Sequence, residues 1–242
     1  MTEQIFKDDA YQKELGARVV EINDRGGIVL DKTIFYATGG GQPGDKGTMS
    51  FGGQTIDIAT TVYGPDKIQI IHVPASQDVM PAVGDDVVLT LDWDTRHKYM
   101  RVHTTMHLMC SLVPFPVTGG QVGADGGRLD FDVDDPSKLN KEQLTTELNR
   151  LISENHSISE RWISDEEMAA NPQLVRTMSV KPPMGAGKVR LLAIGEDGSV
   201  DLQPCGGTHV KSTGEIGEVI VSKIQNKGKQ NRRIRVDLVE GF

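Results

Sequence analysis

Residues 95–113 read TRHKYMRVHTTMHLMCSLV, and this stretch marks the change between two differently patterned parts of the chain. It predicts a helix of about five turns, with Asp94 as its N-cap. Pro114 and Pro116 follow it, and proline ends a helix because it lacks the backbone N–H and its ring clashes with the preceding turn. The parts on either side of this helix are expected to fold differently.

The part before the helix predicts a small β-barrel. Short runs of strand-forming residues alternate there with turns rich in glycine and proline. The runs are ARVVEI (17–22), IVL (28–30), TIDIAT (55–60), KIQIIHV (67–73) and DVVLTLDW (86–93), and the densest turn motif is TGGGQPGDKG (38–47). We therefore place an N-terminal β-barrel domain with a glycine-rich motif at residues 1–92.

The part after the helix, residues 93–242 with the helix included, predicts an α+β domain. A second helix is expected after Asp135–Pro136, because leucines and isoleucine then recur at helical spacing at Leu144, Leu148, Leu151 and Ile152. Ser164 and Glu167 form a capping box for a short third helix. Strands are expected in KVRLLAI (188–194), SVDLQ (199–203), EVIVSKI (218–224) and RRIRVDLV (232–239).

Two pairs of potential metal ligands are present. His103 and His107 are four residues apart in the predicted helix, so both imidazoles lie on one face. Cys205 and His209 are also four apart, in PCGGTHV, where two glycines allow a tight bend. Three nitrogens and one thiolate suit a single tetrahedral zinc ion. Cys110 lies on the same helix face, either as a competing ligand or as a buried apolar residue beside the site.

Composition narrows the class of protein. The 242 residues can form one large domain or two smaller ones, and 37% hydrophobic with 25% charged residues is typical of a soluble globular protein. No apolar run approaches the roughly 20 residues that span a bilayer, and the N-terminus lacks an apolar signal core, so we expect a cytoplasmic protein. With two cysteines, a disulfide framework is not expected.

The net charge of −8 hides a separation of charge along the chain. Between Lys211 and Arg235, seven basic residues stand against two acidic ones, whereas between Asp125 and Glu167 twelve acidic residues stand against five basic ones. We therefore expect a basic surface on which a polyanion docks. The candidate phosphate contacts are the basic residues near the C-terminus: Lys223, Lys227, Lys229, Arg232, Arg233 and Arg235.

Three separated motifs carry a family resemblance. RVHTTMHLM (101–109), DLQPCGGTHVKSTGEIG (201–217) and DKTIFYATGGGQPGDKG (31–47) together resemble the editing domain of alanyl-tRNA synthetase and its free-standing relatives, the AlaX proteins. The resemblance extends over most of the chain, and the N-terminal barrel is similar to that of the medium-length AlaX type. It implies a β-barrel followed by an α+β zinc-binding editing domain of the type common to threonyl- and alanyl-tRNA synthetases.

The resemblance also implies an activity and its residues. The family hydrolyses the ester joining serine or glycine to alanine tRNA, so tRNA is the expected partner. One zinc ion is expected on the residues matching His103, His107, Cys205 and His209. The residues matching Thr33 and Gln42 are expected to shape the amino-acid pocket. The chain is too short to hold an ATP-dependent activation domain as well, so no nucleotide cofactor is expected.

Several alternatives remain open at this level. Zinc either positions the terminal adenosine or the amino group of the substrate, or expands its coordination to activate water, because four protein ligands ordinarily close a zinc site. Thr33 is either the hydrogen-bond partner of the serine hydroxyl or an ordinary strand residue. The chain as a whole is alternatively a noncatalytic, zinc-stapled tRNA-binding accessory protein, or a metallohydrolase of small esters or amides.

Overall fold

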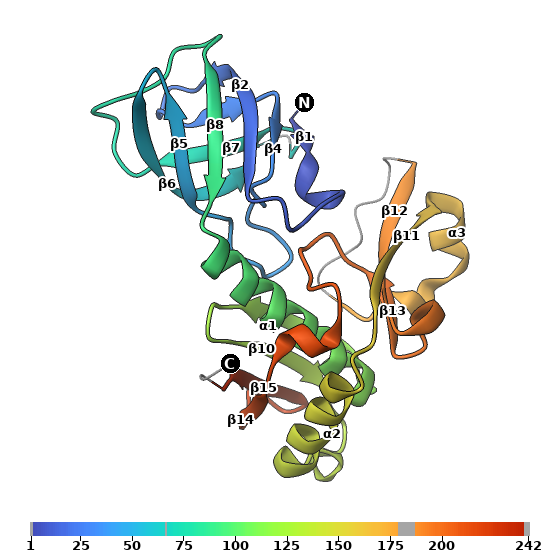
Figure 1. Cartoon of the computed structure of the whole chain (residues 1–242). Coiled ribbons are helices and arrows are strands. Elements are labelled where there is room, and N and C mark those ends of the chain that lie inside the picture. Colours follow the sequence, from blue (N-terminus) through green and yellow to red (C-terminus); the bar gives the residue numbers. More distant parts are fainter. Residues whose placement is uncertain (1, 66, 179–186, 240–242) are drawn as a thin grey trace. The chain divides into compact units, whose positions relative to one another are not determined.

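The computed structural model describes residues 2–65, 67–178 and 187–239 of the 242, and the chain forms two compact units, Met1–His97 and Lys98–Phe242 (Figure 1). The architecture is mixed α and β with a closed barrel in the first unit, which confirms the predicted fold class. Each unit is described by itself below. Within the described residues, no helix combines the length and the apolar character needed to cross a membrane.

The first unit is a closed antiparallel barrel with strand order β2-β3-β7-β6-β5-β8. Its strands are β2 (Glu14–Ile22), β3 (Ile28–Leu30), β5 (Gly47–Phe51), β6 (Gln54–Tyr63), β7 (Ile70–Pro74) and β8 (Asp86–Leu91). In β8 every second residue is buried, so Val87, Leu89 and Leu91 fill the barrel interior, and the residues between them face outward. A short parallel pair, β1 (Glu3–Gln4) with β4 (Lys32–Thr33), adjoins the barrel. The five predicted strands are confirmed, and β1, β4 and β5 were not predicted.

A buried ion pair fixes the glycine-rich motif within this unit. The side chains of Arg96 and Asp45 are in contact and have essentially no exposed surface. Arg96 also donates to the backbone carbonyls of Ala10 and Ile34, at 2.9 and 2.7 Å. The Asp45 carboxylate in turn accepts the backbone N–H of Tyr36. Because a charge buried without partners is costly, this set of bonds holds the motif in one conformation.

Helix α1 (Trp93–Leu112) confirms the predicted helix but not its predicted cap. Asp92, rather than Asp94, caps it, since Asp92 Oδ1 accepts the backbone N–H of Thr95 at 3.1 Å and Oδ2 accepts its hydroxyl at 2.8 Å. A capping side chain must lie just before the first turn, three residues from the amide that it bonds. Asp94 lies inside that turn instead.

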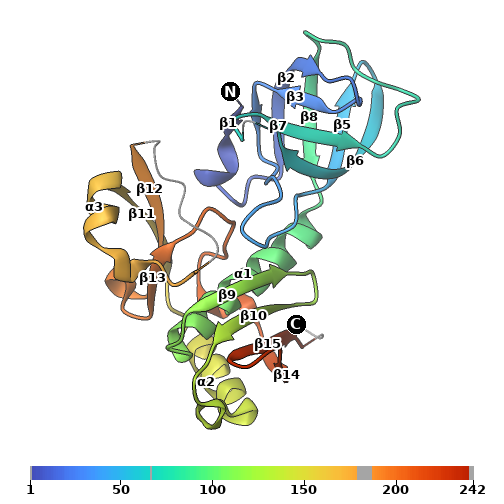
Figure 2. The same ribbon diagram turned by 180° about the vertical axis from the view of Figure 1, so that it is seen from behind.

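The second unit contains a four-stranded antiparallel sheet with order β14-β15-β10-β9 (Figure 2). Its strands are β9 (Val117–Val122), β10 (Gly126–Asp132), β14 (Val219–Asn226) and β15 (Asn231–Leu238). Strands β14 and β15 were predicted, whereas β9 and β10 were not. Gly127 explains why: a Cβ there would lie 2.8 Å from Val102 Cγ1 and 2.9 Å from Met106 Sδ of α1. The glycine permits close approach of the helix, at the expense of strand propensity.

Helix α2 (Lys141–Ser153) lies beside β14, where the Asn149 side chain bonds both the N–H and the C=O of Val219. The predicted apolar face is buried. The helix follows Asp135–Pro136, as predicted, but it does not begin directly there, because a short 3-10 turn, Pro136–Lys138, comes first. The helix begins later because the Asn140 side chain accepts the backbone N–H of Gln143 and so provides its cap.

A second, three-stranded sheet has the order β11-β12-β13, with strands β11 (Ile158–Ser164), β12 (Lys188–Ile194) and β13 (Asp201–Pro204). The capping box of Ser164 and Glu167 opens helix α3 (Asp165–Ala170), as predicted. Strands β12 and β13 confirm their predictions. Strand β11, ISERWIS, was not predicted because most of its residues are polar and exposed at the sheet edge.

Candidate metal centre

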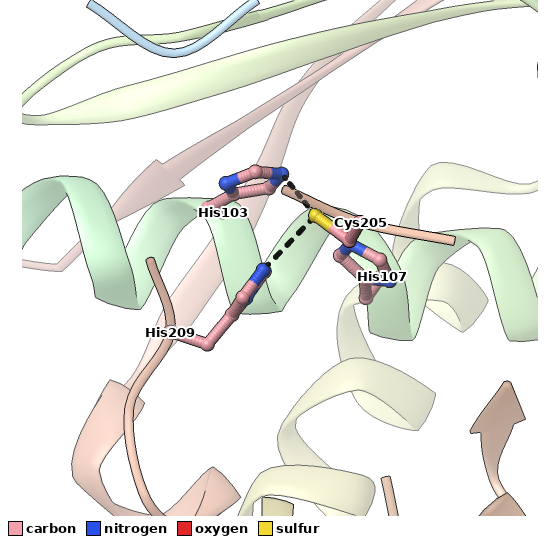
Figure 3. Close-up of side chains that lie close together, drawn as sticks. All are labelled: His103, His107, Cys205 and His209. Carbon is pink, nitrogen blue, oxygen red and sulfur yellow. Dashed lines mark hydrogen bonds between the residues drawn. The ribbon is translucent and has the colours of Figure 1, made fainter. Parts of the chain in front are cut away.

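Helix α1 and the loop after β13 bring four potential ligands together in the second unit. His103 and His107 project from α1, and Cys205 and His209 from the loop (Figure 3). Their ligand atoms all lie within 4.8 Å of one another. Cys205 Sγ is 3.6 Å from His103 Nε2 and 3.2 Å from His209 Nε2. The two predicted pairs therefore form one group.

The chemistry of this group fits a metal ion. Ligands of a tetrahedral zinc ion lie about 3.3–3.7 Å apart, given Zn–N and Zn–S bonds of about 2.0 and 2.3 Å. The two measured distances from the Cys205 sulfur fall close to this range. The three imidazole rings are nearly buried, and their centroids are 4.4 to 5.4 Å apart. Clustered, buried imidazoles beside a thiol are typical of a metal site.

Neighbouring side chains orient two of the imidazoles. Asp201 Oδ2 lies 2.8 Å from His107 Nδ1, and Gln203 Nε2 donates to the same carboxylate oxygen at 2.8 Å. Thr104 Oγ1 lies 3.2 Å from Nδ1 of His209. These contacts at Nδ1 leave Nε2 of both rings for an ion, the arrangement in which carboxylates and hydroxyls usually support metal-binding histidines. Asp201 was not predicted from the sequence, although it lies only four residues before Cys205, at the start of β13.

Electrostatics favour a thiolate in this group. Burial opposes ionisation of Cys205, but the facing imidazoles of His103, His209 and His107 outweigh it and hold the pKa well below 9. Burial also disfavours the charged form of His107, yet Cys205 and Asp201 together raise its pKa to about 10. For His209, burial dominates and lowers the pKa to about 3. A thiolate is the form of cysteine that binds metals.

Arg190 holds the loop that carries Cys205. Its Nη1 donates to the carbonyl of Cys205 at 3.0 Å and to that of Gly207 at 2.8 Å, and its guanidinium contacts Glu160. The backbone N–H of Gly207 points at Cys205 Sγ, 3.4 Å away. The loop therefore presents its sulfur in a fixed geometry. Arg190 was not singled out from the sequence, because its role depends on a strand pairing.

Cys110 lies outside the group of four among the described residues. It is buried, and burial raises the pKa of its thiol to about 12, so it stays protonated. These features match the alternative in which Cys110 is a small apolar residue beside the site.

Thr33 and Gln42, the two residues expected to shape the pocket, belong to the barrel unit and are both buried. Thr33 Oγ1 lies 2.8 Å from His72 Nε2 and accepts the backbone N–H of Phe35 at 3.0 Å. His72 Nδ1 lies 3.1 Å from the carbonyl of Ile28, which can only accept, so Nδ1 carries the proton. Burial lowers the pKa of His72 to about 4. His72 is therefore neutral at pH 7, and the Thr33 hydroxyl donates to it.

The six basic candidates differ in exposure. Arg233 makes two bonds with the Asp130 carboxylate, at 2.7 and 2.8 Å, which lower the pKa of Asp130. Arg232 is buried, and its guanidinium bonds backbone carbonyls of its own hairpin. The candidates with exposed side chains are Lys223, Lys227, Lys229 and Arg235.

The pairing of the strands places one further basic residue, Arg128, beside these candidates. Lys223 and Arg128 both lie opposite Arg235, on β14 and β10 respectively. Residues directly opposite in antiparallel strands project from the same face, so the three form a row across the sheet. Arg128 was missed because β10 was not predicted.

Together, the barrel and the second unit define a two-unit protein with a group of three histidines and one cysteine that could hold a metal ion. Two family models match it: the second additional domain of threonyl and alanyl tRNA synthetases over residues 189–235, and class II (A) tRNA synthetases over residues 3–95. The chain belongs to the alanyl-tRNA editing protein family, as the following relatives establish.

The chain is 32% identical to the alanyl-tRNA editing protein AlaX-M of Methanosarcina mazei, with 99% of this chain and 98% of that protein covered. It is 33% identical to the protein of the same name from Saccharolobus solfataricus, over 97% of this chain and 98% of that protein. It is also 31% identical to the alanine–tRNA ligase of Pyrobaculum aerophilum, of which only 25% is covered. The predicted resemblance is confirmed.

Proposed function

We propose that this chain is an aminoacyl-tRNA deacylase that hydrolyses the seryl ester of alanine tRNA, the glycyl ester, or both. The observation that carries the proposal is the convergence of His103, His107, Cys205 and His209 in a member of the alanyl-tRNA editing family. In the reaction, water adds to the ester carbonyl carbon and the bond to the ribose oxygen breaks. The free amino acid leaves, and the terminal ribose regains its hydroxyl.

The metal in this proposal is one zinc ion held by the four side chains of the group. When bound, it supplies a positive charge that orients the terminal adenosine or the substrate amino group, or an acidified water if its coordination expands. The residues of the chain prepare the site for it. Asp201 and Thr104 fix two imidazoles through their Nδ1 atoms, and Arg190 fixes the loop of Cys205.

Selectivity is assigned to the barrel unit. Serine differs from alanine by one hydroxyl, and a polar partner for that hydroxyl discriminates more strongly than apolar packing does. Thr33 donates its own proton to His72 and accepts from Phe35, so one lone pair of Oγ1 is left. In this proposal, the remaining lone pair of Thr33 Oγ1 accepts a hydrogen bond from the hydroxyl of the serine substrate. Gln42 is assigned to the same pocket.

We assign the tRNA backbone to the exposed basic residues Lys223, Lys227, Lys229 and Arg235 of the second unit, together with the half-buried Arg128, which also contacts Asp130. Lys223, Arg235 and Arg128 form the row across the four-stranded sheet, and Lys227 and Lys229 lie in the hairpin turn between β14 and β15. Such charges attract phosphates without reading sequence. We refer to Lys223, Arg128 and Arg235 as the basic row.

Deacylation of purified substrates tests the proposal. The full chain is incubated with seryl, glycyl and alanyl forms of alanine tRNA, with and without a zinc chelator, and release of amino acid is followed. We expect rapid release of serine or glycine, slow release of alanine, and loss of activity with chelator that added zinc restores. Binding of tRNA without release would favour a noncatalytic accessory protein and overturn the proposal.

The chemical role of zinc is tested separately by metal replacement. Zinc is exchanged for ions of different acidity, and the rate of a single turnover is measured. A rate that follows the acidity of the metal would indicate activated water, because the pKa of bound water depends on the ion. A rate that is the same for all the metals would indicate that zinc positions the substrate instead.

A further inference from the structure

One face of the three-stranded sheet continues from the metal centre to an exposed tryptophan. Asp201 on β13, which bonds His107, lies opposite Ile194 on β12, and Arg190 on β12 lies opposite Trp162 on β11. Residues directly opposite in antiparallel strands project from the same face, and every second residue of a strand does so as well. Trp162 therefore lies on the same sheet face as the residues that support the metal centre.

Arg190 connects this tryptophan to the loop of the metal centre. The backbone N–H of Cys205 bonds the carbonyl of Arg190 at 3.2 Å, which extends the pairing of β12 and β13 by one step. Trp162, Arg190 and Cys205 thus form one row across three neighbouring backbone segments. Neighbouring strands lie about 4.8 Å apart, so the Cα atoms of Trp162 and Cys205 are about 10 Å apart.

Trp162 is not used by the hydrophobic core. Its neighbour Ile163 faces the opposite side of β11, where it packs against Met168, Val189 and Leu191. Trp162 itself is 45% exposed, which is unusual for so large an apolar side chain. Lys188 Nζ lies 4.7 Å from the centroid of its ring. The face therefore presents an aromatic ring with an adjacent cation.

We propose that Trp162 is the stacking platform for the adenine of the 3′-terminal nucleotide of tRNA, with Lys188 beside it for a phosphate. This inference rests on the proposed function, because that function places the terminal ribose ester at the metal centre. The base of the same nucleotide then lies within about 10 Å of the metal centre, which is the separation of the Cα atoms of Trp162 and Cys205. Single-stranded RNA ends are bound in this way, by aromatic rings that stack on bases and by cations that bind phosphates.

Fluorescence tests the contact directly. The chain has two tryptophans, so Trp93→Phe leaves Trp162 as the only tryptophan, and excitation beyond the tyrosine absorption band selects its emission. We expect uncharged alanine tRNA to quench this emission, and the same tRNA lacking its terminal adenosine to bind by anisotropy without quenching. Binding of the intact tRNA with unchanged Trp162 emission would overturn the inference. This readout needs no catalysis.

Kinetics provide a second, independent readout. Trp162→Leu should raise KM for the mischarged tRNA by about 5- to 150-fold, the effect expected for loss of one base–aromatic stack. Trp162→Phe should restore part of the affinity. Val20→Ala is the matched control, since Val20 is 47% exposed on the barrel and is expected to leave KM unchanged. An unchanged KM in a Trp162→Leu protein with normal thermal unfolding would also overturn the inference.

The two proposals fail in different ways. Quenching that depends on the terminal adenosine, without any deacylation, would support the stacking platform and overturn the proposed function. Deacylation without quenching would do the opposite. Because β11 is an edge strand, sedimentation of wild type and Trp162→Leu is included, and a dimer lost in the variant would assign Trp162 to self-association and overturn the inference.

Discussion

Asp201 Oδ2 lies 2.8 Å from His107 Nδ1, although the two residues are 94 positions apart in the chain. The carboxylate fixes the ring so that its other nitrogen faces Cys205. Both side chains are nearly buried, so the bond is shielded from water. The orientation of the ligands thus depends on a residue that does not belong to the ligand set.

Asp201→Asn should therefore weaken zinc binding by about 10- to 100-fold, the usual effect of losing such a supporting group. Competition with a chelator of known affinity measures this. Asp197→Asn is the control, because Asp197 is exposed and its carboxylate contacts Arg161 at the surface. Equal zinc affinities in the two variants would contradict the role of Asp201.

His72 makes stability depend on pH. Its pKa is about 4 in the folded chain and about 6.5 when unfolded, so between these values the unfolded chain binds more protons. The stabilisation is fully present above pH 6.5 and is lost as pH falls toward 4, by about 3 kcal/mol. Chemical denaturation at several pH values should show this loss in the wild type and a flatter profile in His72→Gln.

Thr33→Val should reduce the preference for the seryl over the alanyl ester, because the variant cannot bond the serine hydroxyl. It also leaves Nε2 of His72 buried without a partner, which should cost about 1–3 kcal/mol of unfolding free energy. Thr33→Ser keeps the hydroxyl and should retain both properties. The ratio of the two deacylation rates decides the point, and an unaltered ratio in Thr33→Val would remove Thr33 from the pocket.

Lys223→Ala combined with Arg235→Ala should weaken tRNA binding and reduce the slope of log K against log salt by about 1.4 to 1.8. Lys141→Ala combined with Arg150→Ala on α2 changes the charge equally and serves as the control. If both double variants keep the wild-type slope, the basic row does not contact tRNA.

Arg233→Ala is expected to behave differently from the basic row. It removes two hydrogen bonds to the Asp130 carboxylate and leaves Arg128 as the remaining partner, so it should lower the thermal unfolding temperature more than it lowers tRNA affinity. Thermal unfolding and titration with tRNA separate the two effects. Unchanged stability with a lower affinity for tRNA would contradict this expectation and would indicate that Arg233 contacts a tRNA phosphate.

A structural feature could be predicted from the sequence where the residues that form it are close together in the chain. The ligand pairs were predictable because the spacing of His103 and His107 has a direct meaning on a helix. Asp201 and Trp162 were not, because their positions follow from strand pairing with distant residues. Gly127 acted against the prediction of β10, since it serves a helix contact that the local pattern cannot express.

The buried Arg232 has a consequence for the two lysines beside it. Its guanidinium bonds the carbonyls of Gly228 and Lys229, so it stiffens the turn on which Lys227 and Lys229 stand. A preorganised turn loses less conformational entropy on binding than a flexible turn does. Arg232→Lys would keep the formal charge of the hairpin but leave the turn less ordered. The entropy lost in ordering the turn would then weaken the binding of tRNA to this hairpin.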